Sequence, residues 1–376
     1  MIKKISDDGK DPHSRQSRST FVERASRRMV DLASQLVWNP ERSDRQFGRL
    51  ADLIEKYLAA GEDQVIQRAL ERAPDFRVHD EIVNDVLNCI EWQTISGENA
   101  EPIELILFAV PLHLILHARA DRVAIPWTLP QVDLLVKSFR RHGLVGRAPT
   151  VLLYNYLYAF TELEPLPYSK RYRLPQRLLK TFGGSRPVDL FQHYDYIALP
   201  PGEAHLLLRF IVGLVLQGPE DRQPFADITE TEDSHLERIA GWAGAFAREV
   251  EQQLHRPDLE IICCSSLPAL LQSALQEGHH QHRELALQLL ISQAIDENGS
   301  AVVLSAFIVL PTKQPTLTLI LTHKATEMQV LHYPWQLAPW DDPQVIVASI
   351  SAALGQAGID DIQLGEQAPC RLPYLH

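Results

Sequence analysis

One stretch of this 376-residue chain limits its possible folds more than any other: Leu105–Ala118, fourteen residues without a charged side chain. An uncharged, mostly apolar run of that length has to be buried, either in a protein core or in a membrane. A helix needs about 20 apolar residues to cross the hydrocarbon of a bilayer, and this shorter run also contains Pro111, His113 and His117. We therefore predict a buried helix and no insertion into a membrane.

The hydrophobic periodicity on both sides of this run, from Phe21 to Phe182, is that of helices. Apolar residues recur at spacings of three and four, and Pro or Gly ends several of the segments. We predict helices over residues 28–37, 47–60, 62–73, 80–92, 102–120, 129–142, 150–162 and 175–182. Because the connections are short, neighbouring helices should be antiparallel. Residues 21–185 are thus expected to form a helical domain, either a bundle or a short solenoid-like stack.

The pattern changes after Gly183 and Gly184, where apolar runs become shorter and richer in the β-branched residues that favour strands. Several of these runs follow one another directly, which favours a partly antiparallel sheet. We therefore expect residues 186–376 to form one layered α+β domain with helices on one face. The predicted strands are 194–199, 206–216, 259–265, 301–310, 317–322, 328–333 and 362–364, and the predicted helices are 234–254, 266–276, 282–294 and 343–357, with a break at Gly278.

Charge is distributed unevenly along the chain. The whole sequence has 36 Lys and Arg against 48 Asp and Glu, a net charge of -12. Residues 1–28 hold eight basic and four acidic side chains, so the rest of the chain carries -16. We expect residues 1–20 to be a disordered basic tail and residues 218–235 to be an exposed acidic loop. An acidic body argues against a general attraction to nucleic acid or to an anionic membrane surface.

The cysteines favour a reducing cytoplasm. The sequence has four, Cys89, Cys263, Cys264 and Cys370, and their spacing gives neither a disulfide framework nor a Cys-x-x-Cys pair. Residues 1–19 also lack the apolar segment of a secretory signal. Cys263 and Cys264 follow Ile261 and Ile262 on the predicted buried strand 259–265, where a buried structural role is favoured over a catalytic one.

Strong catalytic signatures do not occur. The chain has no Gly-x-x-x-x-Gly-Lys-Ser/Thr loop, no Gly-x-Gly-x-x-Gly after a strand, no Gly-x-Ser-x-Gly elbow and no His-Glu-x-x-His helix. These absences count against the common nucleotide-binding, dinucleotide-binding, hydrolase and metalloprotease classes. We predict no catalytic residue and no cofactor, and an unfamiliar enzyme stays open as an alternative.

Two groups of side chains are candidates for a metal site. His113, His117 and Asp121 recur every four residues, so they would share one stripe of the predicted buried helix. His279 and His282 would share a face of another helix, within a short His-rich tract. No second set of ligands at a characteristic spacing completes either group. Structural histidines, buried in the core or solvated at a helix break, are therefore preferred over a metal-dependent enzyme.

Two segments interleave aromatic residues with cations or prolines, as surfaces that bind proteins or stack on bases do. They span residues 166–175 and 332–343. The candidate partner-binding residues are Tyr168, Arg171, Tyr172, Tyr333, Trp335 and Trp340. The alternative is that both segments are linkers whose rings cover the core. We expect a non-catalytic cytoplasmic protein that binds another protein, with phosphate or nucleic-acid binding through the basic tail and residues 166–175 as an alternative.

Several short stretches, taken in order, resemble a known family. They are Arg27–Ala33, residues 58–70 around Gly61, Ala109-Val110-Pro111, Gly183-Gly184 and Gly358-Ile359-Asp360-Asp361-Ile362. Together they resemble the proteobacterial domain-of-unknown-function family two-eight-six-three over nearly the whole chain after the tail. Members of that family often carry a Cys-x-x-Cys-Gly near the C-terminus, where this chain has only Cys370. The resemblance implies a bacterial cytoplasmic protein and assigns it no activity.

Overall fold

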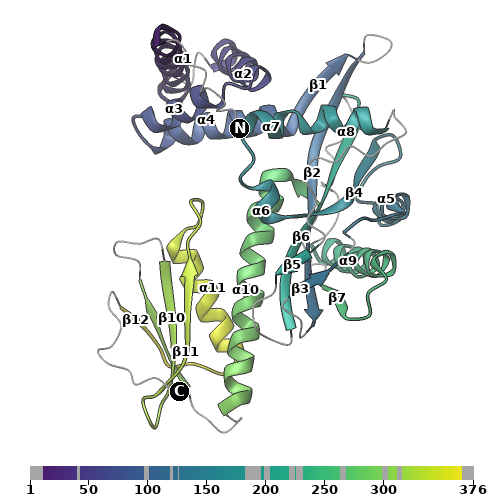
Figure 1. Cartoon of the computed structure of the whole chain (residues 1–376), viewed down its shortest axis with the longest axis vertical. Coiled ribbons are helices and arrows are strands. Elements are labelled where there is room, and N and C mark those ends of the chain that lie inside the picture. Colours follow the sequence, from purple (N-terminus) through teal and green to yellow (C-terminus); the bar gives the residue numbers. More distant parts are fainter. Residues whose placement is uncertain are drawn as a thin grey trace, which may run out of the picture.

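The protein is described here by a computed structural model that covers residues 12–39, 43–96, 101–118, 122–125, 127–182, 196–198, 204–219, 225, 232–262, 268–298, 304–310 and 316–365. Helices and strands are mixed in it, and the strands form two main sheets and a two-stranded ribbon (Figure 1). This confirms the predicted α+β class. The prediction that residues 21–185 are all helical is wrong, because strands occupy residues 92–96, 102–117, 122–124 and 150–159. None of the described helices is both long enough and apolar enough to span a membrane.

The chain begins with four helices that pack on one another, as predicted for residues 28–92. Gly61 turns the chain after the second helix with a φ of 76°, which glycine adopts without strain. Asp75 begins the fourth, because its carboxylate accepts hydrogen bonds from the N–H groups of Arg77 and Val78. The helices are α1 (Pro12–Trp38), α2 (Ser43–Ala60), α3 (Asp63–Arg72) and α4 (Phe76–Glu91).

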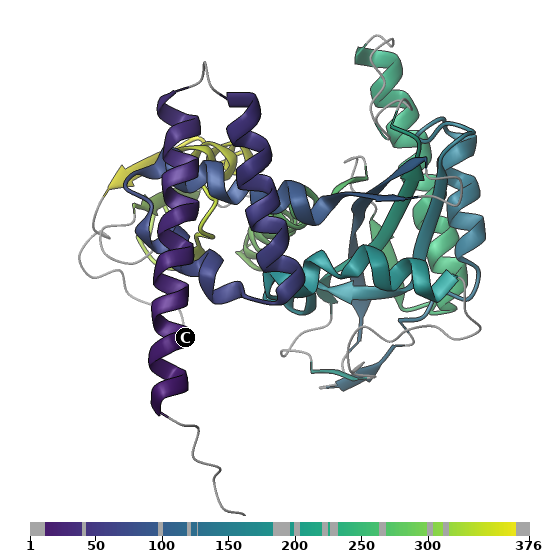
Figure 2. The same ribbon diagram turned by 90° about the horizontal axis from the view of Figure 1, so that it is seen from above.

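Helix α1 lies beside α2 and extends beyond it (Figure 2). Because α1 begins at Pro12, residues 12–20 of the predicted tail are helical, and residues 1–11 lie outside the described chain.

The prediction of a buried helix over Leu105–Ala118 is wrong, because this run forms a long strand, β2 (Pro102–His117). The predicted helix over residues 150–162 is wrong as well, since β4 (Thr150–Ala159) occupies most of it. Every residue from Leu105 to Leu114 is buried. A strand buried on both faces has a continuous apolar run in place of an alternating one, and sequence periodicity cannot separate it from a buried helix.

Strand β2 is the centre of a six-stranded antiparallel sheet. One of its edges pairs with β6 (Ala204–Gln217), which pairs in turn with β4. Its other edge pairs successively with β1 (Trp92–Ser96), β8 (Ala269–Leu270) and β7 (Leu259–Ile262). Pro111, which has no N–H to donate, lies between the stretches that pair with β8 and β7.

Helices cover both faces of this sheet. On one face, Phe108 of β2 contacts Phe139 of α5 (Val132–Arg141), whose ring stacks on Trp242 of α9 (Glu232–Leu254). Helix α10 (Leu271–Asn298) covers the other face. The remaining elements of this part are β3 (Arg122–Ala124), its partner β5 (Tyr196–Ala198), α6 (Phe160–Leu163), α7 (Tyr168–Tyr172) and α8 (Leu174–Phe182).

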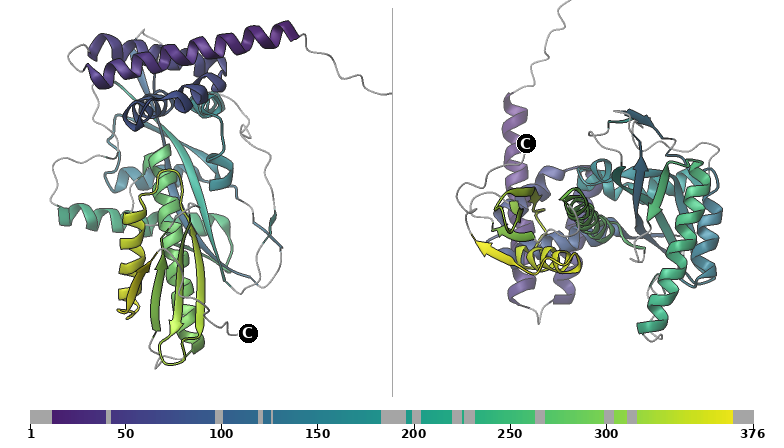
Figure 3. Two further views of the ribbon diagram at one scale, coloured as in Figure 1. Left: turned by 90° about the vertical axis from the view of Figure 1, so that its left-hand side faces the viewer. Right: turned by 90° about the horizontal axis from the view of Figure 1, so that it is seen from below.

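The second sheet is formed by the last four strands, in the order β11-β10-β9-β12. Only β12 runs parallel to its neighbour. Helix α11 and the second half of α10 cover its apolar face, and α10 lies between this sheet and the larger one (Figure 3). The elements are β9 (Leu304–Val309), β10 (Thr316–His323), β11 (Gln329–Gln336), α11 (Pro343–Gln356) and β12 (Ile362–Gly365), all of them predicted.

The strands after residue 186 do not form the single layered domain that the sequence suggested. Strands β6, β7 and β8 belong to the larger sheet, and only the last four form the second. The predicted domain boundary at 185/186 lies outside the described chain, as do Cys263, Cys264 and most of the predicted acidic loop over 218–235. The last four residues of that loop, 232–235, belong to α9. Buried apolar side chains form one cluster from Ala25 to Leu275 and another from Leu287 to Ile359, so the two clusters meet along α10.

Helix α10 runs unbroken through Gly278, so the predicted break there is wrong. The glycine serves close packing instead. A Cβ on Gly278 would lie 2.7 Å from Cβ of Pro111 and 3.0 Å from Cε1 of Phe210, two residues of β2 and β6. A single glycine therefore lets the helix lie against the sheet at the point where they cross.

We expect Gly278→Ala to lower the free energy of unfolding by about 1–2 kcal/mol, because overpacking against Pro111 outweighs the gain in helix propensity. The control is Gly244→Ala in α9, where an added Cβ meets no atom within 4 Å. That variant should gain up to about 1 kcal/mol from propensity alone. Urea denaturation measures both, and a stabilised Gly278→Ala would contradict the close approach.

Candidate functional site: a groove between helices α10 and α11

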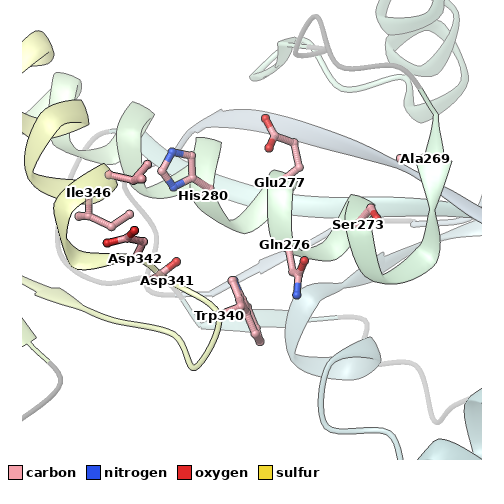
Figure 4. Close-up of a pocket in the computed structure, with 10 residues that line it drawn as sticks. Ala269, Ser273, Gln276, Glu277, His280, Trp340, Asp341, Asp342 and Ile346 are labelled. Carbon is pink, nitrogen blue, oxygen red and sulfur yellow. The ribbon is translucent and has the colours of Figure 1, made fainter. Parts of the chain in front are cut away.

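An open groove of about 670 Å³ lies between α10 and the start of α11 (Figure 4). Its side chains come from one face of α10, from the loop that follows β11 and from the first turn of α11. The residues that line it include Gln276, Glu277, His280, Trp340, Asp342 and Val345. The groove is therefore built by segments about 60 residues apart in sequence, which a buried ion pair holds together.

That ion pair joins Arg283 of α10 to Asp341 of the loop. The two Nη atoms of Arg283 donate hydrogen bonds to the two carboxylate oxygens of Asp341 at 2.6 and 2.8 Å, and Nη1 also donates to the carbonyl of Gln336. The two side chains are only 8% and 4% exposed. Burial alone would raise the pKa of Asp341, but the hydrogen bonds from Arg283 and from the N–H of Ala338 lower it overall. Trp340, next in sequence to Asp341, is fixed at the rim by this pair.

The loop leads directly into α11. The carboxylate of Asp342 accepts a hydrogen bond of 2.8 Å from the N–H of Gln344, and Pro343 occupies the first turn, both of which favour a helix start at this point. The first turn then brings Val345 and Ile346 to the groove. Ile346 is buried, whereas the apolar side chain of Val345 is 57% exposed.

The three histidines of the tract on α10 contact three different parts of the protein. The ring of His279 stacks on Phe160 at 4.5 Å, and the ring of His282 stacks on His113 of β2 at 5.8 Å. His280 lies 3.2 Å from a carboxylate oxygen of Glu284. Because these rings point in different directions, they do not converge on one ion.

The described residues contain no group of three His, Cys, Asp or Glu side chains that could hold a metal. The predicted stripe of His113, His117 and Asp121 required a helix, and the segment is a strand. Four residues of strand separate the Cα atoms of His113 and His117 by about 13 Å, too far for one ion. Asp121 lies outside the described residues.

His113 ties the sheet to α10, since its Nε2–H donates a hydrogen bond of 3.1 Å to the carbonyl of Gly278. Burial lowers the pKa of His113, His279 and His282 to about 4 each. The charge of Arg283 contributes to this lowering at His279 and His282, and His282 contributes to it at His113, in each case less than burial does. These three rings are therefore neutral at pH 7, and they pack as apolar groups between the sheet and the helix.

No family model, no curated protein and no solved structure matches the chain. The resemblance to family two-eight-six-three stays a prediction, and the case for a function depends on the geometry of the groove.

Of the predicted partner-binding residues in the second segment, only Trp340 lines the groove. Trp335 and Tyr333 belong to β11, where Trp335 is fully buried beneath the guanidinium of Arg283 and Tyr333 is half-buried. No sequence pattern selects Val345 or Glu277. A Val at the start of an apolar helix becomes notable only when the fold leaves it exposed.

The predicted residues of the first segment lie on α7 and serve the fold. The guanidinium of Arg171 donates to Oε1 of Gln272 at 2.7 Å and to the carbonyl of Glu164. Tyr172 is buried, and its hydroxyl donates to Glu55 at 2.8 Å. Tyr168 is half-buried. This segment therefore anchors α7 inside the protein and offers little free surface to a nucleic acid.

Acid should act in opposite directions on two buried parts of the protein. A histidine whose pKa is lowered in the folded protein binds more protons when the protein is unfolded. Because of His282, the free energy of unfolding therefore decreases as the pH falls from about 6.5 to 4. Burial raises the pKa of Asp85, in α4, to about 7. Because of Asp85, the free energy of unfolding therefore increases over the same range of falling pH.

We expect His282→Phe to reduce the loss of unfolding free energy between pH 7 and 5 by about 2 kcal/mol, and Asp85→Asn to increase that loss by a similar amount. Urea denaturation at the two pH values measures each change. Equal pH dependence in wild type and both variants would contradict the burial of these groups in the native state.

Proposed function

We propose that this protein is a non-catalytic binding protein whose groove between α10 and α11 receives an apolar side chain of another protein. The observation that supports this is the exposure of Val345 in a groove that Trp340 and several polar side chains also line. Protein-binding sites combine apolar and polar side chains in this way, and Trp is a favoured anchor in them. We infer a cytoplasmic setting from the cysteine usage of the sequence.

The polar groups around the groove favour binding over catalysis. The carboxylate of Asp341 is held by Arg283, Asp342 caps α11 and His280 is paired with Glu284. A general acid or base must reach the proton it transfers, and these groups are occupied by contacts that build the groove walls. What the groove offers a ligand is the apolar surface of Val345 and Trp340, together with the exposed carboxylates of Glu277 and Asp342.

The test compares two variants, each with an exposed apolar residue replaced by glutamate. Val345→Glu places a charge in the groove, and Leu289→Glu makes the matched change at a 46% exposed side chain of α10 that does not line it. The full chain is immobilised and challenged with a phage library of random 12-residue peptides. We expect wild type and Leu289→Glu to enrich the same peptides, and Val345→Glu to bind them at least about tenfold more weakly.

Two results would overturn the proposal. One is a wild-type protein that enriches no peptide sequence. The other is a Val345→Glu variant that binds the selected peptides as well as Leu289→Glu does, because the groove would then not be the site of binding.

A further inference from the structure

Two exposed carboxylates line the groove, one from each of the helices that build it. Glu277 projects from α10, and Asp342 stands at the start of α11 (Figure 4). Trp340 lies on the wall between β11 and α11. A segment bound between the two helices therefore meets a carboxylate from each of them.

These two carboxylates keep their charge uncompensated. Glu277 accepts a hydrogen bond of 2.6 Å from the amide of Gln281, and Asp342 accepts one at Oδ1 from a backbone N–H. Neither donor carries a full positive charge, although the dipole of α11 favours the carboxylate of Asp342. Within the described part of the chain, no Lys, Arg or His forms an ion pair with Glu277 or Asp342.

The other acidic side chains near the groove do not contribute in this way. Asp341 is paired with Arg283 in the interior, and Glu284 lies against His280 and accepts a hydrogen bond from Ser349. The negative potential at the groove thus comes from its two rim positions, Glu277 and Asp342. The indole ring of Trp340, which also lines the groove, adds a surface over which a cation is favourable.

We infer that the segment bound in this groove is cationic, with an apolar anchor flanked by Lys or Arg, and that acidic segments are rejected. This inference depends on the proposed function, because it specifies the partner of the same groove. Complementary charge at the rim selects among partners and speeds association more than it adds affinity. Like charges brought together at the same positions disfavour the wrong partners.

The experiment uses two defined peptide libraries with Leu at the centre, one with flanking positions drawn from Lys and Gln and the other from Glu and Gln. Wild type should enrich the Lys library at least about tenfold over the Glu library at low salt, and the preference should shrink at 0.5 M salt because of screening. A double variant, Glu277→Gln and Asp342→Asn, removes both charges while Asn still caps α11. That variant should lose the preference and still bind Leu-containing peptides.

The matched control is Glu297→Gln. Glu297 is an exposed residue of the same helix, outside the groove, and it accepts a similar hydrogen bond of 2.7 Å from Gln293. The control should keep the wild-type preference. Equal enrichment of both libraries, with binding still lost in Val345→Glu, would overturn the inference and leave the proposed function standing. Binding that does not depend on Val345 would overturn both.

Discussion

Arg283→Met should lower the free energy of unfolding by about 3–5 kcal/mol, because it leaves the carboxylate of Asp341 buried without a counter-ion. The change also removes the hydrogen bond to the carbonyl of Gln336 and the contact of the guanidinium with the ring of Trp335. Urea denaturation measures the loss. Since Asp341 holds Trp340 in place, tryptophan fluorescence of the folded variant should shift toward that of a solvent-exposed indole.

A double-mutant cycle separates the ion pair from simple packing. Arg283→Met combined with Asp341→Leu removes both charges, and such replacements of a buried pair by apolar residues are often neutral. We expect the double variant to recover at least half of the stability that the single variant loses. A cost of less than about 1 kcal/mol for Arg283→Met alone is typical of an exposed ion pair. That result would contradict the role of the buried pair in holding the loop against α10.

Arg171→Met should cost about 2–4 kcal/mol, with a larger loss at pH 8 than at pH 6. Arg171 is buried, and its guanidinium bonds Gln272 in the first turn of α10 and the carbonyl of Glu164. The carboxylate of Glu91 also accepts a hydrogen bond from the N–H of Gln272. These contacts join the N-terminal helices and α7 to the start of α10.

The pH dependence follows from Glu91. Burial raises the pKa of Glu91 to about 7, and Arg171 opposes that rise. Without Arg171 the folded pKa increases further, so the folded variant loses stability as the pH rises through 7 and the buried carboxylate ionises. Lys170→Met is the control, because Lys170 is exposed and should change stability by less than about 0.5 kcal/mol. Identical losses at pH 6 and pH 8 would contradict this role of Arg171.

Elements with one apolar face could be predicted from the sequence. Helices α2, α3 and α4 each bury one stripe, so their period identified them, and short runs rich in β-branched residues identified strands β9 and β10. The prediction for β2 was wrong because this strand is buried on both faces, so its apolar residues do not alternate with polar ones. The break predicted at Gly278 failed for a different reason, because only the crossing of α10 over β2 and β6 shows why a glycine is needed there.

The candidate site was partly within reach of the sequence. Trp340 could be selected because an aromatic residue among prolines suggests an exposed surface, but the same reasoning selected Trp335, which is buried. His113 and His282, which are distant in the sequence, are in contact in the structure, where their neutral rings stack on each other. Val345 and Glu277 could not be found, since their importance comes from the side chains that the fold places opposite them.

Because helix α10 contributes side chains to both hydrophobic cores, it affects the order in which the newly synthesised chain can fold. Leu271, Ala274 and Leu275 fill the core of the larger sheet, although β2, its central strand, is made more than 150 residues earlier. That core therefore stays incomplete on the ribosome until Leu275 has emerged. The second core then forms on the far end of a helix that the first has already fixed, so the N-terminal part acts as the template on which the C-terminal part assembles.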